Sequence, residues 1–427
     1  MIVILEGFLR DFNSVLPLFN PQTVRRLVTD FYRSLPGRQD PVVFAAMNVV
    51  LGLSHRHAVN GKSHAGDAAE YLRRAQSVVT EVILGETHLL NIQVLLGMVI
   101  LLRGSRDDQT LLILVATAMR LAHKLGLHDR ATSQLLDSAS AAERANVFWI
   151  AYVLDKHISM AMKQPSVQLD DDIDLDLPSD YMLEHTPEAL TVGSGAITST
   201  DELLKPDYFR ARIQLASIEG GVYDYLYSTR AQKRNAEERA HALDSVARAL
   251  KAWKASMATD FGDASVVRRT SPETLHFVTE LHATAFQCAT LINHAHAWNP
   301  KWVTDIRTTA LNGTALLLPP SWQEVVFEAR KLMDLFHALP EMEPANFWVS
   351  GCSYISALMI VTANLVNNSL DRKAMIHDRL VDIGIEKLTT MSDRTGSQQL
   401  LEFRDMCQEL KQNSRLHLGM QQTLPVY

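Results

Sequence analysis

Apolar residues recur every three or four positions along most of this chain, which is the spacing of one face of an α-helix. The alternating pattern of a strand is rare. The segment before Gly126 is the clearest example, because its apolar stripe stops at this glycine, as helices commonly do. The stripe consists of Leu111, Val115, Ala118, Ala122 and Leu125. Over the whole chain, the spacing predicts helices at 21–34, 41–57, 64–84, 87–103, 108–125, 141–163, 206–229, 234–258, 271–296, 321–338, 345–368, 372–391 and 397–411.

The stretch from Glu143 to Pro178 combines two periods. Its first part keeps the helical step, but past Pro165 the step changes to two, since three apolar residues alternate with three aspartates. The alternating residues are Ile173, Leu175 and Leu177 with Asp172, Asp174 and Asp176. Such a pattern suits an extended segment with apolar groups on one side and carboxylates on the other. We therefore predict a core helix at 141–163 followed by an extended acidic strap at about 166–178, which lies across the outside of the helical body.

The predicted fold class is all-α: a large single helical domain, built as a multi-helix array over residues 1–427. Three stretches interrupt the helical spacing, at 186–206, 259–272 and 298–320, and they are polar or rich in glycine or proline. No internal repeat divides the chain. Its 427 residues are ample to bury a core.

Composition and charge describe an ordinary globular protein. Apolar residues make up 47% of the chain and charged residues 21%. The net charge of −7 has the wrong sign for a domain that mainly binds phosphates. The three cysteines, Cys288, Cys352 and Cys407, are too few and too far apart for a disulfide framework or a clustered zinc site, so we expect a reducing compartment.

Two apolar stretches raise the question of targeting or membrane insertion. The first, Met1 to Leu5, is followed at once by Glu6 and is too short for a signal peptide. The second, 347–370, is uncharged and long enough to span a bilayer, but it contains serine and asparagine residues that lipid penalises. We therefore predict a buried core helix there, with Phe347, Trp348 and Tyr354 in core packing rather than lining a pocket, and no membrane association.

The aspartates of the strap permit an alternative function. Asp170, Asp171 and Asp174 match the aspartate-rich pattern with which helical prenyl-diphosphate enzymes hold magnesium. Such carboxylates must lie on a helix that faces a cavity, and no helix of useful length fits between Pro165 and Pro178. A magnesium-dependent, all-helical enzyme of the terpene-cyclase type is therefore the alternative rather than the first prediction.

The remaining motifs predict no chemistry. Gly61-Lys62-Ser63 resembles the end of a phosphate loop, but the glycine required upstream is Arg56. His55 and His57, two residues apart, point in different directions on a helix and cannot chelate a metal together. Basic residues are interleaved with acidic ones, which is typical of a solvated helix face. We therefore predict no catalytic, metal-binding or DNA-binding residue and no cofactor.

Asp155 has the clearest physical consequence, because it lies on the apolar stripe of its helix. A carboxylate buried there needs a cationic partner or several hydrogen bonds. Arg120, on the preceding long helix, is the first candidate partner, and Arg144 is the second. The alternative is that Asp155 lies at the rim of the stripe and is solvated by water.

Several motifs between residues 118 and 178 follow one another in a recognisable order and spacing. They include Ala118-Met-Arg120, Leu125-Gly126-Leu127-His128, Glu143-Arg144, Phe148-Trp149, Asp155, Pro165, Asp172, Asp174 and Pro178. This pattern resembles the middle homology region of fungal binuclear zinc-cluster transcription factors. The resemblance is specific from about 10 to 180. It gives a best-matching core at about 10–260 and a C-terminal helical part at 271–411.

The resemblance implies a structural signature of this family: Arg120, Leu125, Gly126, Leu127, His128, Glu143, Arg144, Phe148, Trp149, Asp155, Pro165, Asp172, Asp174 and Pro178. It also implies a nuclear transcriptional regulator, not an enzyme, that controls a metabolic or secondary-metabolite pathway. Regulation would act through a small effector or through protein partners, which are other transcription proteins or a DNA-binding partner.

The zinc cluster that precedes this region in the family needs six cysteines, which this chain does not contain. We therefore expect no direct DNA binding by this chain alone, either because it is a fragment of a longer factor or because it acts through a partner. Homodimer formation stays open, and a helical scaffold without a transcriptional role is the remaining alternative.

Overall fold

The computed structural model is α-helical and confirms the predicted fold class. No strand is found among the residues that it describes, which form only two isolated β-bridges. The structure describes residues 2–33, 39–57, 65–105, 107–178, 195–197, 207–257, 269–296, 321–339, 344–367 and 374–422. The predicted interruption at 298–320 lies outside these residues, as do Gly61-Lys62-Ser63 and most of 186–206 and 259–272.

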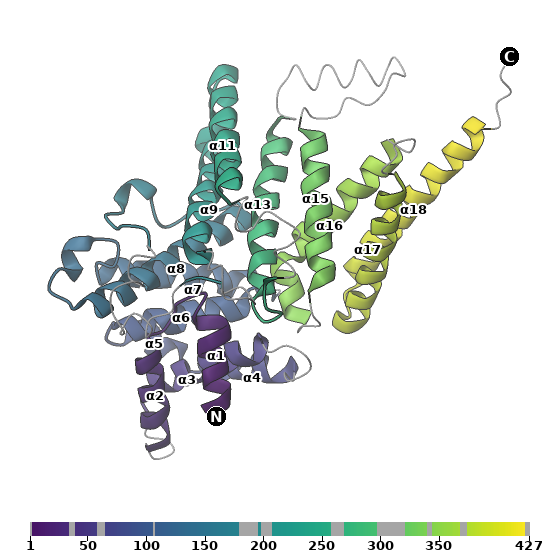
Figure 1. Ribbon diagram of the computed structural model, residues 1–427. Helices are drawn as coiled ribbons and strands as arrows, with labels where there is room; N and C mark the ends of the chain where they lie inside the picture. Colours follow the sequence, from purple (N-terminus) through teal and green to yellow (C-terminus); the bar gives the residue numbers. More distant parts are fainter. Residues whose placement is uncertain are drawn as a thin grey trace. The chain divides into compact units, whose positions relative to one another are not determined.

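The chain divides into two compact units. Unit 1 consists of Met1–Val278 and Pro340–Asn346, and unit 2 of Thr279–Leu339 and Phe347–Tyr427. Figure 1 shows the helices of both units.

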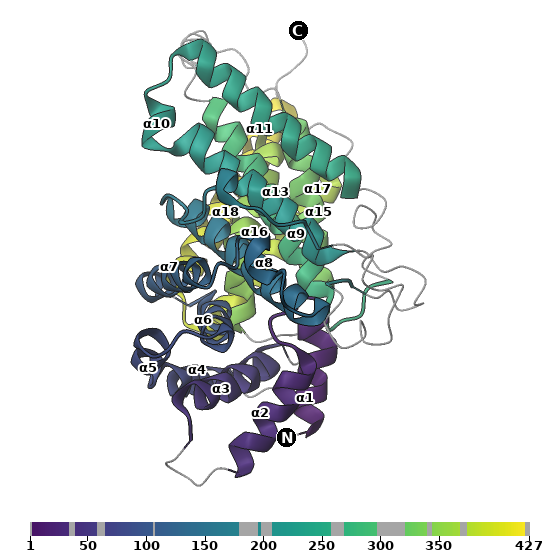
Figure 2. The ribbon, with the colours of Figure 1, turned by 90° about the vertical axis from the view of Figure 1, so that its left-hand side faces the viewer.

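In unit 1, α3 packs on α4 and α6, and from α6 onward the long helices pack on one another in chain order. Contacts join α3 to α6, α6 to α7, α7 to α8, α8 to α9 and α9 to α11. Figures 1 and 2 show α9 and α11 side by side. The helices are α1 (Ile2–Phe8), α2 (Pro21–Arg33), α3 (Pro41–Arg56), α4 (Ala65–Gln76), α5 (Val79–Leu84), α6 (Leu89–Leu102), α7 (Asp108–Lys124), α8 (Ser138–Met162), α9 (Tyr208–Val222), α10 (Thr229–Gln232) and α11 (Ala236–Met257).

Two helices form the centre of unit 1. Helix α6 is apolar on every side, which is typical of a fully buried helix, and it contacts α3, α7 and α8. Helix α8 is buried without interruption from Asn146 to Lys156. Asp137 caps its N-terminus, where the carboxylate accepts a hydrogen bond from the Ser140 amide. The predicted core helix at 141–163 is confirmed and begins one turn earlier than predicted.

Unit 2 packs around an apolar core on α16. Phe336, Phe347 and Tyr354 lie in this core, and the ring centroids of Phe336 and Tyr354 are 4.8 Å apart. The predicted core role of the 345–360 aromatics is therefore confirmed. Within α16, Phe347–Leu365 is long and apolar enough to cross a membrane by length and composition, and 61% of this segment is buried. The helices are α13 (Leu275–His296), which begins at the end of unit 1, α15 (Trp322–Ala338), α16 (Pro344–Asn367), α17 (Ala374–Thr395) and α18 (Gln398–Gln422).

The structure departs from the predicted helices in several places. The helix predicted at 206–229 ends at Val222 and continues as a π-helical turn, Tyr223–Tyr227, and the helix predicted at 397–411 extends to Gln422. The single helix expected at 64–84 is split into α4 and α5 at Ser77, whose hydroxyl donates a hydrogen bond back to the Arg74 carbonyl. The first residues form α1 and a π-helical turn, Leu9–Asn13, which the spacing did not predict. There Asn13 holds the following turn, because its amide donates to the Phe19 carbonyl and accepts from the Phe19 amide.

Candidate functional site: a pocket beneath the acidic strap

Three consecutive ionisable residues, Asp155, Lys156 and His157, lie in the buried part of α8. We call them the α8 triplet. The side chains of Asp155 and Lys156 are almost fully buried, and that of His157 is 13% exposed. Successive helix residues point about 100° apart, so the three side chains reach different neighbours. Two of them meet the strap, and the third meets α9.

Asp155 is fixed by the backbone of the strap. Its carboxylate accepts hydrogen bonds from the amides of Val167, at 3.1 Å, and Gln168, at 2.9 Å. Burial is the largest influence on this group and raises the pKa of Asp155, although both amides and Lys156 act in the opposite direction. The predicted burial of Asp155 is confirmed, and the rim alternative is wrong.

The predicted partners of Asp155 are wrong. Arg120 lies on the exposed side of α7. Arg144 instead donates to the Leu125 carbonyl at the end of α7, at 2.7 Å. The physical reason is that backbone amides of a returning segment can satisfy a buried carboxylate as well as a cation does. A sequence pattern does not show where such a segment returns.

Lys156 belongs to the candidate site, although the sequence pattern did not predict it. Its Nζ donates to Ser166 Oγ at 3.0 Å and to the Gln168 carbonyl at 2.8 Å. It also pairs with Asp170 Oδ1 at 2.7 Å. An ammonium has three N–H donors, and these three acceptors use them all. Lys156 therefore binds the strap base, which we define as Val167–Asp172, to α8.

His157 joins α8 to α9 through a buried carboxylate. Its Nδ1 lies 2.6 Å from Glu219 Oε1, and Arg212 donates to Glu219 Oε2 at 2.7 Å. Glu219 and Arg212 are almost completely inaccessible to solvent. Burial alone would raise the pKa of Glu219, but Arg212 and His157 together lower it. The floor formed by α8 and α9 is therefore held by buried charges.

The strap has two parts. The base ends in a single 3₁₀ turn, Asp170–Asp172, and the buried Gln168 donates to the Asp172 carbonyl at 3.1 Å. From Ile173 to Pro178, which we call the strap tip, the backbone is extended. The three apolar residues of the tip are half-buried, and the alternating aspartates are exposed, as predicted.

The strap tip lies beside the loop that follows α7. The Asp174 amide donates to the His128 carbonyl, and the Asp174 carbonyl accepts from the Arg130 amide, both at 3.0 Å. Gly126 begins this loop with a φ of +65°, and a Cβ there would lie 2.5 Å from a methyl group of Thr132. Glycine is thus required at this position by both conformation and space. On the other side of the tip, Trp149 Nε1 donates to the Asp176 carbonyl at 3.1 Å.

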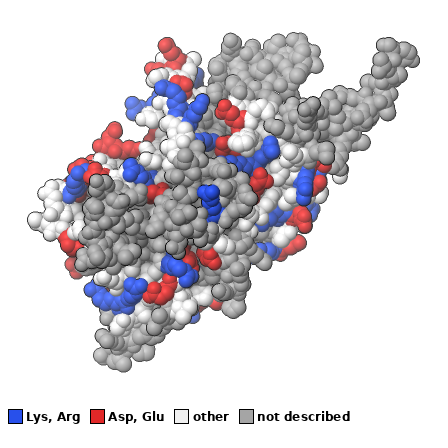
Figure 3. All heavy atoms as spheres, in the orientation of Figure 1, with Lys and Arg blue, Asp and Glu red and all other residues white. Residues whose placement is uncertain are grey.

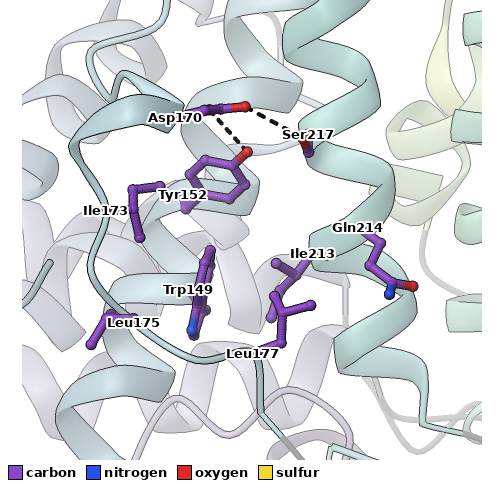
Figure 4. Close-up of a pocket in the computed structure, with 9 residues that line it drawn as sticks. All are labelled: Trp149, Tyr152, Asp170, Ile173, Leu175, Leu177, Ile213, Gln214 and Ser217. Atoms are coloured by element: carbon purple, nitrogen blue, oxygen red, sulfur yellow. Dashed lines mark hydrogen bonds between the residues drawn. The ribbon is translucent and has the colours of Figure 1, made fainter. Parts of the chain in front are cut away.

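A cavity of about 410 Å³ lies between the strap, α8 and α9 (Figure 4). We call it the strap pocket. At one end, Tyr152 and Ser217 donate hydrogen bonds to the Asp170 carboxylate, at 3.1 and 3.3 Å. Apolar side chains surround Trp149 at the other end (Figure 4). The lining residues are Trp149, Tyr152, Asp170, Ile173, Leu175, Leu177, Ile213, Gln214 and Ser217.

The structure brings together only part of the predicted family signature. His128, in the loop after α7, bonds to Asp174 of the strap tip, and Arg144 bonds to the Leu125 carbonyl where this loop begins. Asp155 and Asp172 belong to the contacts of the strap base. Glu143 lies elsewhere, where its carboxylate accepts from the Asn20 amide and Gln93 Nε2. Arg120 and Pro165 are exposed, and Phe148 is buried.

Trp149 is the only member of the signature that lines the strap pocket. The apolar alternation of the tip was the sequence signal for the pocket wall, because it predicted which side faces inward. No pattern in the sequence predicted that Tyr152 and residues of α9 would line the same pocket.

The magnesium-enzyme alternative does not fit this geometry. Asp170 and Asp171 lie on a 3₁₀ turn rather than on the wall of a long helix. The Asp170 carboxylate is engaged by Lys156, Tyr152 and Ser217. In the described part of the chain, no group of three or more potential ligands is arranged to hold a metal ion.

The fold and the pocket define an all-helical domain with a ligand-sized cavity under an acidic strap. Residues 5–255 match the family described as "Fungal specific transcription factor domain". The chain belongs to this family, which confirms the resemblance found in the sequence.

Related proteins carry the names of transcription factors. The chain is 30% identical over 422 residues to proteins of Aspergillus oryzae and Aspergillus fumigatus named "ABC-transporter-regulating transcription factor". Each alignment covers 97% of this chain and 46% of the relative, so the chain spans about half the length of these proteins. It is 23% identical over 421 residues to the fusaridione A cluster transcription factor of Fusarium heterosporum, with 98% of this chain and 77% of the relative covered. No solved structure matches the chain.

Proposed function

We propose that this chain is a regulatory domain that controls transcription in the nucleus and receives its signal at the strap pocket. Family membership and the names of the relatives support the transcriptional role. The observation that carries the proposal is the pocket itself, since its volume lies within the roughly 300–1,000 Å³ typical of ligand sites. Its wall is a segment that a bound molecule can hold in place against α8 and α9.

The regulated genes are proposed by similarity. The Aspergillus relatives are named for the regulation of ABC transporters, and the Fusarium relative for the fusaridione A cluster. We infer that this chain controls a transporter or secondary-metabolite pathway. Transcript profiling of a strain that lacks the gene tests this inference, because unchanged levels of both gene classes would contradict it.

A reporter assay tests the regulatory role directly. The full chain is fused to an unrelated DNA-binding domain and expressed in yeast with a matching reporter gene and a fluorescent tag. We expect nuclear fluorescence and a reporter level that differs from that of the DNA-binding domain alone. Gln214→Trp, which fills the pocket from the half-exposed surface of α9, should change that level. A stable, nuclear fusion protein that leaves the reporter level unchanged would contradict the proposal.

Asp171→Asn is the matched control for this assay. Asp171 lies on the same 3₁₀ turn as Asp170 and is exposed, but it is absent from the pocket lining. The control should therefore leave the reporter level unchanged.

We also propose that the chain acts through protein partners, without binding DNA or catalysing a reaction itself. On the face shown in Figure 3, basic and acidic side chains of the described residues are interspersed, as on a solvated surface. A gel-shift experiment with the purified chain tests the DNA part of this proposal. Salt-sensitive and sequence-selective binding would contradict it.

The two compact units are proposed to act as a single regulatory domain over residues 1–427. The similarity to the Aspergillus relatives supports this, because it runs over 422 residues and so includes both units. We expect one cooperative transition in calorimetry of the full chain. Two separate transitions, each assigned to one unit by hydrogen exchange, would instead favour independent domains.

A further inference from the structure

The polar end of the strap pocket carries a carboxylate with spare acceptor capacity. Asp170 is 44% exposed and is the only charged side chain among the described residues that line the pocket. Its Oδ1 takes two contacts, from Lys156 and Tyr152, whereas its Oδ2 takes one longer bond from Ser217. A carboxylate accepts about four hydrogen bonds, so Asp170 can accept one more from a molecule in the pocket.

The charges around this end favour a cation over an anion. Lys156 is buried, and its three N–H donors already meet protein acceptors. The ammonium of Lys156 balances the charge of Asp170, and the Asp224 carboxylate, which interacts electrostatically with both, makes the sum at this end negative. The exposed aspartates of the strap add further negative charge outside the pocket, of which Arg130 offsets a part through its ion pair with Asp176.

The other end of the pocket suits a flat apolar group. The rings of Trp149 and Tyr152 meet edge to face, with centroids 5.4 Å apart and an interplanar angle of 87°. Figure 4 shows Leu177 and Ile213 on one side of Trp149 and Leu175 on the other. The indole N–H is already bonded to the Asp176 carbonyl, so the ring offers apolar surface and a π face rather than a donor.

From these observations we infer that the strap pocket binds an amphipathic organic cation, a small molecule with a flat apolar body and a protonated amine that pairs with Asp170. The inference rests on the proposed function, since it names the chemical class of the effector. Such a molecule contacts the strap through Asp170 and Leu175 and α9 through Ile213. It therefore holds the strap tip against the floor of the pocket.

Three probes of the same shape and different charge test the inference. They are 2-naphthylmethylamine, 2-naphthalenemethanol and 2-naphthoate, titrated at pH 7 into the full chain and followed by saturation-transfer NMR. The amine should bind most tightly, because it gains a charge-assisted hydrogen bond to Asp170, and the carboxylate most weakly, because Asp170 repels it. We expect a difference of about tenfold or more in Kd between these two probes. Equal affinities, or a preference for the carboxylate, would overturn the inference.

Three variants, of which Asp171→Asn is the control, show where the amine binds. Asp170→Asn should lower the affinity for the amine about tenfold and leave that for the alcohol almost unchanged, whereas Asp171→Asn, which removes only an exposed charge outside the pocket, should change the affinity for the amine far less. Gln214→Lys, at a half-exposed position that tolerates substitution, should reverse the order of amine and carboxylate even if Asp170→Asn fails to fold. If the order of affinities survives both Asp170→Asn and Gln214→Lys, the amine binds elsewhere and the inference is wrong.

The reporter assay separates this inference from the proposed function. A reporter that responds to Gln214→Trp, combined with no charge preference among the probes, would reject the cation and keep the regulatory pocket. A clear preference for the amine in the absence of any reporter effect would keep the binding site and reject the regulatory role.

Discussion

The base and the tip of the strap are held in physically different ways. The base is bonded to buried groups of α8, through Asp155 and Lys156. The tip accepts one hydrogen bond from the buried Trp149 and forms a single β-bridge with the loop after α7. It also forms ion pairs with the exposed Arg130. Buried bonds are costly to break because water cannot replace them, whereas exposed ion pairs contribute little.

This difference predicts which part of the strap can move to open the pocket. A segment held by few and exposed contacts opens locally at a low free-energy cost, and a segment held by buried polar groups opens only with its surroundings. The tip carries the apolar wall of the strap pocket, while the base carries Asp170. We therefore expect the apolar wall to move for ligand entry while the carboxylate stays in place.

The largest effect should come from the floor on which the base rests. Glu219→Ala removes the buried carboxylate that pairs with Arg212 and His157, and breaking such a buried pair by removing one partner costs about 3–5 kcal/mol. Hydrogen-exchange mass spectrometry of α8 and α9 peptides measures this loss. Glu237→Ala, on the exposed start of α11, is the control and should change stability by less than about 0.5 kcal/mol. A loss below about 1 kcal/mol at Glu219 would mean that the floor is not held by buried charge.

The Glu219 carboxylate should also make the free energy of unfolding depend on pH. This effect should be no larger than the effect of Glu219→Ala. The pKa of Glu219 is lower in the folded protein than its ordinary value of 4.5. Its contribution is therefore fully present above pH 4.5 and is lost as the pH falls through the folded pKa. Urea unfolding at several pH values should show a shallower acid limb for Glu219→Gln. Parallel curves for the variant and the original chain would contradict this.

Asp155→Asn tests the base itself. The amide side chain keeps one acceptor and presents an NH₂ group to the second strap amide, which is then left buried without an acceptor. We expect a loss of about 1–3 kcal/mol in unfolding free energy and faster exchange at Val167 and Gln168. If only the tip exchanged faster, the base would not depend on Asp155.

Trp149→Phe tests the tip. The variant keeps an aromatic ring but removes the donor to the Asp176 carbonyl, which is worth about 1 kcal/mol. Exchange should accelerate at the Asp174 amide of the tip, which donates to the His128 carbonyl, and remain unchanged in the base. Acceleration of both parts together would show that the strap opens as one unit.

Arg130→Ala should have the smallest effect. The ion pair of Arg130 with Asp176 spans 2.9 Å between two exposed side chains, and such pairs contribute about 0–1 kcal/mol. Exchange in the tip should rise slightly at low ionic strength, and the difference should vanish at about 1 M salt, where charges are screened within about 3 Å. A large effect that salt does not reduce would show that this ion pair stabilises the tip as a buried pair does.

The sequence determined the local features of this protein. Apolar spacing predicted the long helices and the burial of Asp155, and the alternation after Pro165 predicted which side of the strap faces inward. These features depend on neighbours in the chain, because the period of a helix or of an extended segment is set by local backbone geometry. The family motifs were readable for the same reason, since they consist of residues at short spacings.

The partners of the buried charges follow from long-range packing. A buried carboxylate must be satisfied, but whether by Arg120 or by the amides of Val167 and Gln168 depends on where the strap returns to α8. Likewise, Lys156 in the sequence is an ordinary charged residue, and it becomes the anchor of the base because Ser166, Gln168 and Asp170 arrive around it. Long-range packing chooses these pairs, and no local pattern records that choice.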